Sequence, residues 1–464
     1  LDLFVCGYDC ENRLYLNQGN GTFIESAEKA GLNYRGASIM IAFADYDLDG
    51  DLDAYLCNNH VDPQEAPLWK YEKDARGMPI VTADLKGIAK PLYRSDLKDG
   101  MLIPAGESDI LYQNNGDGTF SDVSAKAGIH DEDFGLSCTW WDFDHDGDPD
   151  LYNSNDFYGS DHLYRNNGDG TFTNVNKLAL PHTPWFSMGS DVADVNNDGW
   201  LDFMASDMQG TTHYKQKISM GDMQGWFLET AVPRQYMRNA LYINSGTSRF
   251  QEGAFLAGVA STDWTWSLKF GDLDSDGKED LYVTNGAERY WDNSDIMNAA
   301  RGAQRINTPE LKKVWLPSPV RNDPNLAYRN LGDLNFENVS KAWGLSAAKV
   351  SYGAALGDLD LDGDLDLVVN NFDEAASLYH NNSHENQLAL ISLQGTESNR
   401  DGLGALFKIN ATSGKQTKYH TLTRGFMSAN APMIAIGLGK SAQFDLTIEW
   451  PSGTHQTLTN LKAG

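Results

Sequence analysis

The chain alternates short apolar runs with clusters of acidic and turn-forming residues, and this pattern recurs along its length. Runs such as SCTWWDF and TDWTWSLKF have the length and alternation of β-strands. Each leads into an aspartate-rich loop, which is followed by a second apolar run such as DLYV. A third run of the form LYRN is followed by an Asn/Gly/Asp turn and a Phe, which is typical of a β-hairpin. One unit therefore predicts four short strands.

Five complete copies of the aspartate loop are present. They are DYDLDGDLD from Asp45, DFDHDGDPD from Asp142, DVNNDGWLD from Asp194, DLDSDGKED from Asp272 and DLDLDGDLD from Asp358. The chain opens on LDLFV, the tail of the same unit, so we expect a sixth copy that is cut within its loop. Four-stranded units repeated around an axis predict a β-propeller. A linear solenoid would need nearly constant periods, whereas these loops lie 52 to 97 residues apart.

The uneven spacing comes from insertions between the second and third strands of a unit, near residues 61–107, 206–237 and 285–324. In an up-and-down sheet these connections leave from the edge opposite the aspartate loops, so we expect them on one face together. Long connections grouped on a rigid scaffold often carry binding or catalysis. The segments SDIMNAARGAQRI and TPELKKVW have helical spacing, so some helix is expected there.

Aromatic side chains in the insertions are candidates for a ligand-binding face. The candidates are Trp69, Tyr71, Trp226, Tyr290 and Trp291. Such rings stack on sugars, but they also pack insertions onto a scaffold, and the sequence leaves both readings open. No phosphate-binding glycine loop, GxSxG or HExxH motif is found, so no catalytic residue is assigned.

Each aspartate loop has the chemistry of a cation site, with acidic residues at positions 1, 3, 5 and 9 and glycine at position 6. Carboxylates at this density on a flexible loop suit Ca²⁺, as in an EF-hand loop with an earlier closing acid. The predicted ligands are Asp45, Asp47, Asp49, Asp53, Asp142, Asp144, Asp146, Asp150, Asp194, Asn196, Asp198, Asp202, Asp272, Asp274, Asp276, Asp280, Asp358, Asp360, Asp362 and Asp366. We expect about five or more structural calcium sites. The third loop should be the weakest, because Asn196 replaces a carboxylate and Trp200 occupies position 7.

The composition narrows the classes of partner that the protein is expected to bind. The 464 residues carry 65 acidic and 36 basic side chains, a formal net charge of −29. This charge argues against nucleic acid or an anionic membrane surface as the main partner. Five bound calcium ions would reduce it to about −19. No apolar run approaches the roughly 18 residues needed for a transmembrane helix, and the four cysteines leave their pairing open.

The end of the chain departs from the repeat. From about residue 384 the segments ALISL, ALFKI, MIAIGL and FDLTIEW alternate apolar and polar residues, which predicts a small β-sandwich-like or barrel-like domain over 384–464. The propeller is expected over 1–383.

The combination DxDxDGxxDLYV and NxLYRNNGDGTF resembles the FG-GAP/VCBS repeats of integrin-α-like propellers. The tail, with NRDGLGA and WPSG, is similar to the ASPIC/UnbV domain of the cartilage-acidic-protein family. The segment TDWTWSLKFGDLDSDGKEDLYVTNG is also similar to surface proteins of Bacteroidota. The resemblance implies calcium in the aspartate loops and a seven-bladed propeller, of which six blades are visible. Family members are mostly adhesive or of unknown role.

Three functions are compatible with the sequence. The leading hypothesis is an extracellular or cell-surface protein, stabilised by calcium, that binds a glycan or protein partner through the insertion face. Free calcium is abundant outside the cytoplasm, which favours that location. The alternatives are a polysaccharide lyase or sugar dehydratase on a propeller scaffold, and a structural subunit of a membrane-associated or multi-protein surface assembly.

Overall fold

A computed structural model describes residues 2–61, 71–73, 79–81, 93–94, 103–157, 159–219, 231–296, 316–383 and 385–464. For residues 71–104 only the backbone of four short strands is described. These are β7 (Tyr71–Lys73), β8 (Pro79–Val81), β9 (Tyr93–Arg94) and β10 (Ile103–Pro104).

Six antiparallel sheets follow one another along the chain, one for each predicted repeat. Sheet one contains β1 (Leu3–Val5), β3 (Arg13–Asn17) and β4 (Phe23–Glu25). Sheet two contains β2 (Tyr8–Glu11), β5 (Arg35–Ala44), β6 (Asp53–Asn58), β11 (Ile110–Asn114) and β12 (Phe120–Asp122). Sheet three contains β13 (Phe134–Trp141), β14 (Asp150–Asp156), β15 (His162–Asn166) and β16 (Phe172–Asn174).

The remaining repeat sheets have the same order of strands. Sheet four contains β18 (Ser190–Ala193), β19 (Asp202–Ala205), β21 (Ala240–Ile243) and β22 (Gln251–Glu252). Sheet five contains β23 (Thr265–Gly271), β24 (Asp280–Asn285), β25 (Leu326–Asn330) and β26 (Phe336–Asn338). Sheet six contains β27 (Ser351–Gly357), β28 (Asp366–Asn371) and β29 (Ser377–Tyr379). A separate parallel pair joins β17 (Thr183–Pro184) to β20 (Gln235–Tyr236).

The apolar core lies between consecutive sheets, because successive side chains on a strand point to opposite faces. In the LYxN motif the Leu faces the next sheet and the Tyr faces the previous one. Leu111 of sheet two and Tyr164 of sheet three, for example, meet in one core cluster. The first strands of sheets two to six also pack against one another in order. The prediction of an all-β, propeller-like fold is confirmed, whereas the count of seven blades stays a prediction.

The two end sheets differ from the inner ones in what their outer faces expose. Leu378 of sheet six is 68% exposed, although the matching Leu111, Leu163, Leu241 and Ala327 are fully buried. Phe23 of sheet one is 49% exposed, whereas the matching phenylalanines of sheets three to five are at most 8% exposed. The outer faces of sheets one and six therefore carry side chains that the inner sheets bury.

Short helices connect one repeat to the next. Most are single turns after the fourth strand, and three of them end in a left-handed glycine, the usual C-terminal cap. The described helices are α1 (Ala27–Ala30), α2 (Ser124–Ala127), α3 (Asn176–Ala179), α4 (His213–Ile218) and α6 (Ala254–Ala257). Only α4 belongs to an insertion. Most of the segment 294–306 and all of 308–315, where helix was predicted, lie outside the described residues.

The C-terminal domain is a two-sheet β structure. One sheet pairs β30 (Gln387–Ile391) with β33 (Ile434–Gly439), and the other contains β31 (Leu406–Ala411), β32 (Gly414–Tyr419), β34 (Gln443–Glu449) and β35 (His455–Lys462). Residues from both sheets, among them Phe407 and Ile436, form a common buried core. This agrees with the expected sandwich-like domain.

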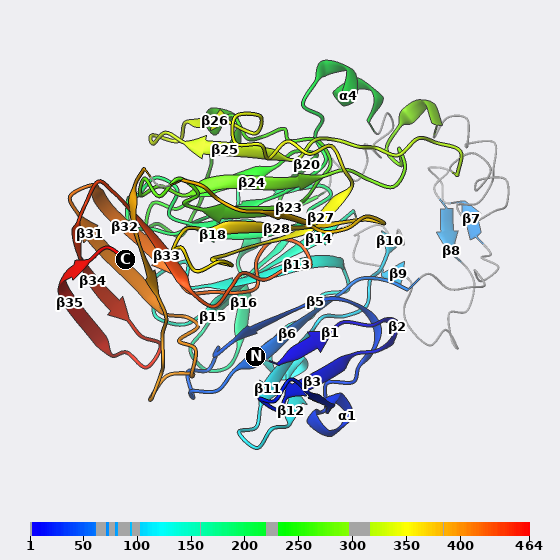
Figure 1. Cartoon of the computed structure of the whole chain (residues 1–464). Helices are drawn as coiled ribbons and strands as arrows, with labels where there is room; N and C mark the ends of the chain where they lie inside the picture. Colours follow the sequence, from blue (N-terminus) through cyan, green and yellow to red (C-terminus); the bar gives the residue numbers. More distant parts are fainter. Residues whose placement is uncertain are drawn as a thin grey trace.

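Figure 1 shows the C-terminal domain at one end of the repeat strands, with β7, β8, β9, β10 and α4 toward the opposite end. The connection between β32 and β33, residues 420–433, leaves this domain and runs along the first strands of sheets four to six; we call it the axial arm. Gly425 donates its backbone N–H to Ser190 (2.6 Å), and Ala431 donates to Leu356 (3.0 Å). Lys269 also donates to the Arg424 carbonyl (2.6 Å). The arm thus fixes the C-terminal domain to the centre of the repeat sheets.

The four cysteines are all free. Cys57 and Cys138 are buried between sheets two and three. Cys6 and Cys10 lie near the chain start and are not joined by a disulfide.

Candidate metal loops and the insertion face

The five aspartate loops have one shared backbone conformation. Position 6 is glycine with φ between 97° and 105° in every loop, a region that glycine enters at little cost. Position 4 is also left-handed, with φ between 55° and 63°, although it carries Leu, His, Asn, Ser and Leu. Non-glycine residues seldom adopt this conformation. The repeated strain shows that the loop geometry is imposed by contacts within the loop.

The aspartate at position 1 accepts hydrogen bonds from backbone N–H groups later in the same loop. Asp142 accepts backbone N–H bonds from Asp146 (3.2 Å) and Gly147 (3.0 Å). Asp272 accepts the same pair of bonds, at 2.9 and 2.8 Å. The position-5 aspartate in turn accepts the N–H of position 7 in all five loops. These bonds turn the carboxylates of alternate positions toward one centre.

The closing aspartate at position 9 has a role that the sequence analysis did not assign. In sheet three, Asp150 Oδ2 accepts the N–H of Phe143 (3.0 Å), and its Oδ1 accepts the N–H of Asn166 (2.8 Å). The same two bonds recur in the other four loops. Position 9 therefore ties the loop to the third strand in addition to any contact with a cation.

The Asn of LYxN joins neighbouring sheets and was also missed. Asn166 donates its side-chain amide to the Tyr46 carbonyl of the previous loop (2.8 Å). Asn244, Asn330 and Asn381 bond the previous loop in the same way. The signal was present in the sequence, because this Asn stands in every copy of the motif. Its role could not be predicted from the sequence, because the carbonyl that accepts its hydrogen bond lies more than a hundred residues away.

Carboxylate oxygens converge in four of the five loops. The groups whose oxygens lie within 4.8 Å of one another are Asp45/Asp47/Asp53, Asp142/Asp144/Asp146, Asp272/Asp274/Asp276 and Asp358/Asp360/Asp362. Asp358 is 7% exposed, and its Oδ1 has no hydrogen-bond donor. Asp47 and Asp144 also keep one buried oxygen without a donor. Buried carboxylate oxygens are costly unless a donor or a cation meets them, so these residues fit a hard cation.

Burial also shifts the titration of these groups. It raises the pKa of Asp45 to about 6, of Asp142 and Asp194 to about 7, and of Asp272 to about 8. The cause is mainly the loss of water around the charged form, which neighbouring carboxylates reinforce. A divalent cation would reverse this trend, because it favours the charged form.

In the third and fourth loops, other side chains of the protein contact the carboxylates. In the third loop Asn196 donates its amide to Asp198 (2.9 Å), so one predicted ligand is engaged with another. In the fourth loop Arg329 lies 2.6 Å from Asp274, and Lys278 lies 3.0 Å from Asp276. These side chains supply part of the counter-charge. The lower calcium affinity expected of the third loop stays a prediction.

The C-terminal domain rests on these loops. Asn386 donates to the Asp274 carbonyl (2.8 Å), and Gly439 donates to the Ser275 carbonyl (2.9 Å). Lys418 pairs with Glu279. A Cβ placed on Gly437 would lie 1.8 Å from Asp272 Oδ2. The fourth loop is therefore packed directly between its own sheet and the C-terminal domain.

On the insertion face, a buried ionic network joins the second and third insertions. Arg321 is 1% exposed and contacts Asp292 (2.5 Å) and Asp323 (2.6 Å). Lys215 of α4 bridges Asp323 and Asp263, both at 2.7 Å. Because each charge has a close partner, the network holds α4 of the second insertion against Asp292, Arg321 and Asp323 of the third.

Two of the predicted ligand-face aromatics lie at this network. The Arg321 guanidinium lies 5.6 Å from the centre of the half-buried Tyr290 ring, and Trp291 next to it is 41% exposed. Trp69 and Trp226 lie outside the described residues, and only the backbone of Tyr71 is described. The structure therefore brings Tyr290 and Trp291 together and leaves the other three candidates untested.

A cavity of about 830 Å³ lies beside sheets two and three, lined by Tyr34, Glu107, Asp109, Lys126 and His130 among others. Asp109, at its edge, is tied to the scaffold, because it accepts bonds from the Asn58 N–H (2.6 Å) and the Tyr55 hydroxyl (2.7 Å). Asp161 occupies the same place in the next repeat and accepts the N–H of Asn155 (2.8 Å). Asn239 and Asn325 accept the corresponding backbone N–H in sheets four and five, so Asp109 fills a structural position of the repeat.

Comparison with known protein families agrees with this architecture. The model described as "FG-GAP-like repeat" matches residues 1–56, 101–153, 142–205 and 228–283. The model described as "ASPIC and UnbV" matches residues 395–464. The chain therefore contains FG-GAP-like repeats and, near its C-terminal end, an ASPIC/UnbV domain.

Individual relatives are distant. Cartilage acidic protein 1 of Homo sapiens is 25% identical over 250 residues, which cover 46% of this chain and 37% of that protein. The chain thus matches little more than a third of that relative's length. Within the described residues, no helix has both the length and the apolar character needed to span a bilayer.

Solved structures with a related arrangement are more distant still. An Agrocybe aegerita lectin that recognises non-reducing terminal N-acetylglucosamine has a TM-score of 0.38 at 15% identity, covering 82% of this chain and 74% of its own. The exotype rhamnogalacturonan lyase YesX has a TM-score of 0.34 at 13% identity, covering 98% and 67%. Scores below 0.5 are too low to transfer a site or an activity.

Proposed function

We propose that this protein is a calcium-dependent binding protein that works outside the cell or on its surface. In this proposal the aspartate loops hold Ca²⁺, the ions lock the C-terminal domain to the repeat sheets, and the insertion face recognises a glycan or protein partner. The observation that carries the proposal is the set of loops with one backbone conformation, in which buried carboxylates converge.

Calcium would be held by the carboxylates at positions 1, 3 and 5, with position 9 anchoring the loop from behind. Such oxygen-rich sites bind Ca²⁺ in flexible geometry. The ion would neutralise charge that burial otherwise disfavours, and it would supply structural rigidity. An environment rich in free calcium would keep the sites filled, which supports an extracellular or cell-surface location.

The contacts of the C-terminal domain support a role for the ions in domain docking. The fourth loop touches this domain through Asp274 and Ser275, and in the first loop Gly50 lies close to the Glu397 carbonyl. In the last loop Gly363 packs against Leu388. Without a cation, the crowded carboxylates of a loop would repel one another and destabilise the surface that presents these contacts. Docking should therefore depend on calcium.

Binding at the insertion face is supported by the Arg321 ionic network next to an exposed aromatic ring, Trp291. Trp291 presents a large flat surface, and aromatic rings of this kind stack on sugar rings or fill pockets in protein partners. The Arg321 network holds the backbone beneath it. This arrangement favours recognition without large rearrangement.

The test is a binding screen of calcium-loaded protein on immobilised glycans and surface proteins. We expect Trp291→Ala to weaken the strongest interaction at least about tenfold, the effect of removing an interface anchor. Leu256→Ala is the matched control, since Leu256 is more exposed (76%) and lies on α6. Equal losses in both variants, or turnover of a polysaccharide by the wild-type protein, would contradict the proposal.

A further inference from the structure

One position of the repeat reaches back over the aspartate loop of its own sheet. It is the residue between Tyr and Asn in LYxN. Gln113 in this position donates to Asp47 (2.7 Å), and Arg329 pairs with Asp274 (2.6 Å). Leu16, Arg165 and Ile243 occupy it in sheets one, three and four. In sheet six it is His380, and of these six residues only histidine is a common metal ligand.

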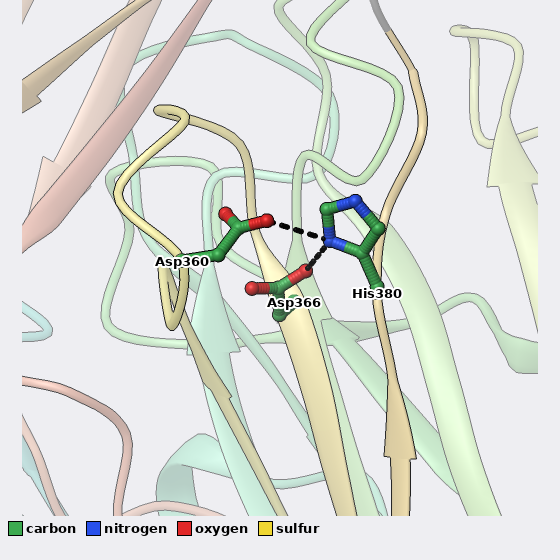
Figure 2. Close-up of side chains that lie close together, drawn as sticks. All are labelled: Asp360, Asp366 and His380. Atoms are coloured by element: carbon green, nitrogen blue, oxygen red, sulfur yellow. Dashed lines mark hydrogen bonds and ion pairs between the residues drawn. The ribbon is translucent and has the colours of Figure 1, made fainter.

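His380 meets two carboxylates of the last loop (Figure 2). Its Nδ1 lies 3.0 Å from Asp360 Oδ2 and 3.3 Å from Asp366 Oδ1. The three ligand atoms are within 4.8 Å of one another. The histidine comes from the end of β29, Asp366 is the first residue of β28, and Asp360 lies in the loop. Three separate segments thus converge on one point.

Backbone N–H groups hold one of these ligands, Asp366, in place before any ion binds. Asp366 is 2% exposed; its Oδ2 accepts the Leu359 N–H (2.9 Å) and its Oδ1 accepts the Asn381 N–H (2.8 Å). Since a carboxylate oxygen has two lone pairs, Oδ1 keeps one for a further partner. The His380 side chain is 48% exposed, so an ion can enter from solvent.

A second observation in the same loop indicates a cation. Asp358 is buried, and its Oδ1 has no donor, while Asp358 and Asp360 belong to one converging group. Hydrogen bonds alone therefore do not satisfy the carboxylates of this loop, even with His380 beside them.

We propose that Asp360, Asp366 and His380 form a mixed nitrogen and oxygen site for a divalent transition-metal ion of the Co²⁺, Ni²⁺ or Zn²⁺ class. Imidazole nitrogen favours these ions, whereas Ca²⁺ selects all-oxygen sites. The sixth sheet would then bind a different metal from the sheets whose loops contain only oxygen ligands. This inference extends the calcium proposal at one loop, and its failure can be distinguished from the failure of that proposal.

The alternative is that His380 serves as an internal cation, as Arg329 does in sheet five. A protonated imidazole between two carboxylates would satisfy them without a metal. It would leave no nitrogen lone pair at Nδ1 for coordination. The two readings predict opposite results when a transition metal is offered in the presence of calcium.

The experiment uses the whole chain, stripped with a chelator and then saturated with Ca²⁺. Co²⁺ is added, and binding is followed by calorimetry and by the visible absorption of Co²⁺, which reports nitrogen ligation. We expect one Co²⁺ per chain. His380→Gln, which copies Gln113, should weaken binding by more than about tenfold, the least that loss of a partner at a metal site costs. The Ca²⁺ isotherm of the other loops should not change.

A matched gain-of-function variant completes the test. Gln113→His in the His380→Gln background places an imidazole over Asp47 and should restore a Co²⁺ site in sheet two. The proposal is overturned if Co²⁺ does not bind, if His380→Gln binds it as tightly as wild type, or if Ca²⁺ displaces it stoichiometrically. Co²⁺ binding through His380 without Ca²⁺ binding elsewhere would instead sink only the calcium proposal.

Discussion

The two faces of the repeat sheets differ in how far their segments resemble one another from repeat to repeat. On the loop face, five segments that differ in residue type at positions 4 and 7 share a left-handed φ at positions 4 and 6 and the same hydrogen bonds, and the C-terminal domain contacts them. On the insertion face, the segments share neither length nor sequence, and described parts of the second and third are joined by one buried ionic network. A feature that recurs in every sheet serves the stability of each sheet. A feature that occurs once can vary in sequence and can therefore serve recognition. The loop face should therefore govern stability, and the insertion face should govern binding.

Removal of calcium should produce the largest effect. Each filled site stabilises the folded state by about 2.7 kcal/mol at a hundredfold excess of ion over Kd, and several loops act together. Chelation should therefore lower the melting temperature strongly and open the link to the C-terminal domain to protease. Thermal scans and limited proteolysis with EDTA, and then with Ca²⁺ restored, measure this. An unchanged melting temperature would mean that the loops do not control stability.

The axial arm connects the two faces, and Phe426 is its anchor. This residue is 4% exposed and packs against Trp266, with ring centres 5.0 Å apart. Phe426→Ala should cost about 3–5 kcal/mol, as for other buried phenylalanines. Urea unfolding measures the loss. Met427→Ala, next to it but 51% exposed, is the control, and equal losses would show that the arm is not anchored by this ring.

Acid should weaken the C-terminal domain through His420, at the start of the arm. Burial, with help from Arg424, lowers its pKa to about 4. Between pH 4 and the ordinary value near 6.5, the unfolded chain binds a proton that the folded protein does not. Stability is therefore complete above about pH 6.5 and falls by up to about 3 kcal/mol as the pH drops to 4.

The measurement is urea unfolding across that range at saturating calcium. His420→Gln should flatten the profile relative to wild type, whereas the same change at the exposed His455 should leave it as it is. Identical profiles for wild type and His420→Gln would exclude this histidine as the source of the acid sensitivity.

A smaller effect separates the anchoring and ligand roles within one loop. Asp150→Asn replaces an oxygen that accepts a backbone N–H, so it should cost about 1–3 kcal/mol with or without calcium. Asp144→Asn should cost stability only when calcium is present, because its Oδ1 has no donor in the loop. Unfolding of both variants in Ca²⁺ and in EDTA makes the comparison. The same calcium dependence in both would show that position 9 is an ordinary ligand.

The sequence predicted the repeat, the all-β fold and the loop positions because these depend on local spacing. DxDxDG fixes where carboxylates stand along the chain, and LYxN fixes which side chains face the neighbouring sheets. The double role of Asp150 and the bridge from Asn166 to Tyr46 could not be derived, since each depends on a strand brought near only by folding.

The sequence by itself determined that this is a chain of acidic, cation-suited loops on repeated β-sheets with a distinct C-terminal β domain. Only the tertiary structure decided what those loops touch. In the folded protein the C-terminal domain contacts the loops, and residues 420–433 run along the first strands of sheets four to six. His380 lies next to Asp360 and Asp366. Local patterns encode strands and turns through short-range sterics and periodicity, whereas contacts between distant segments arise from packing that no single stretch contains.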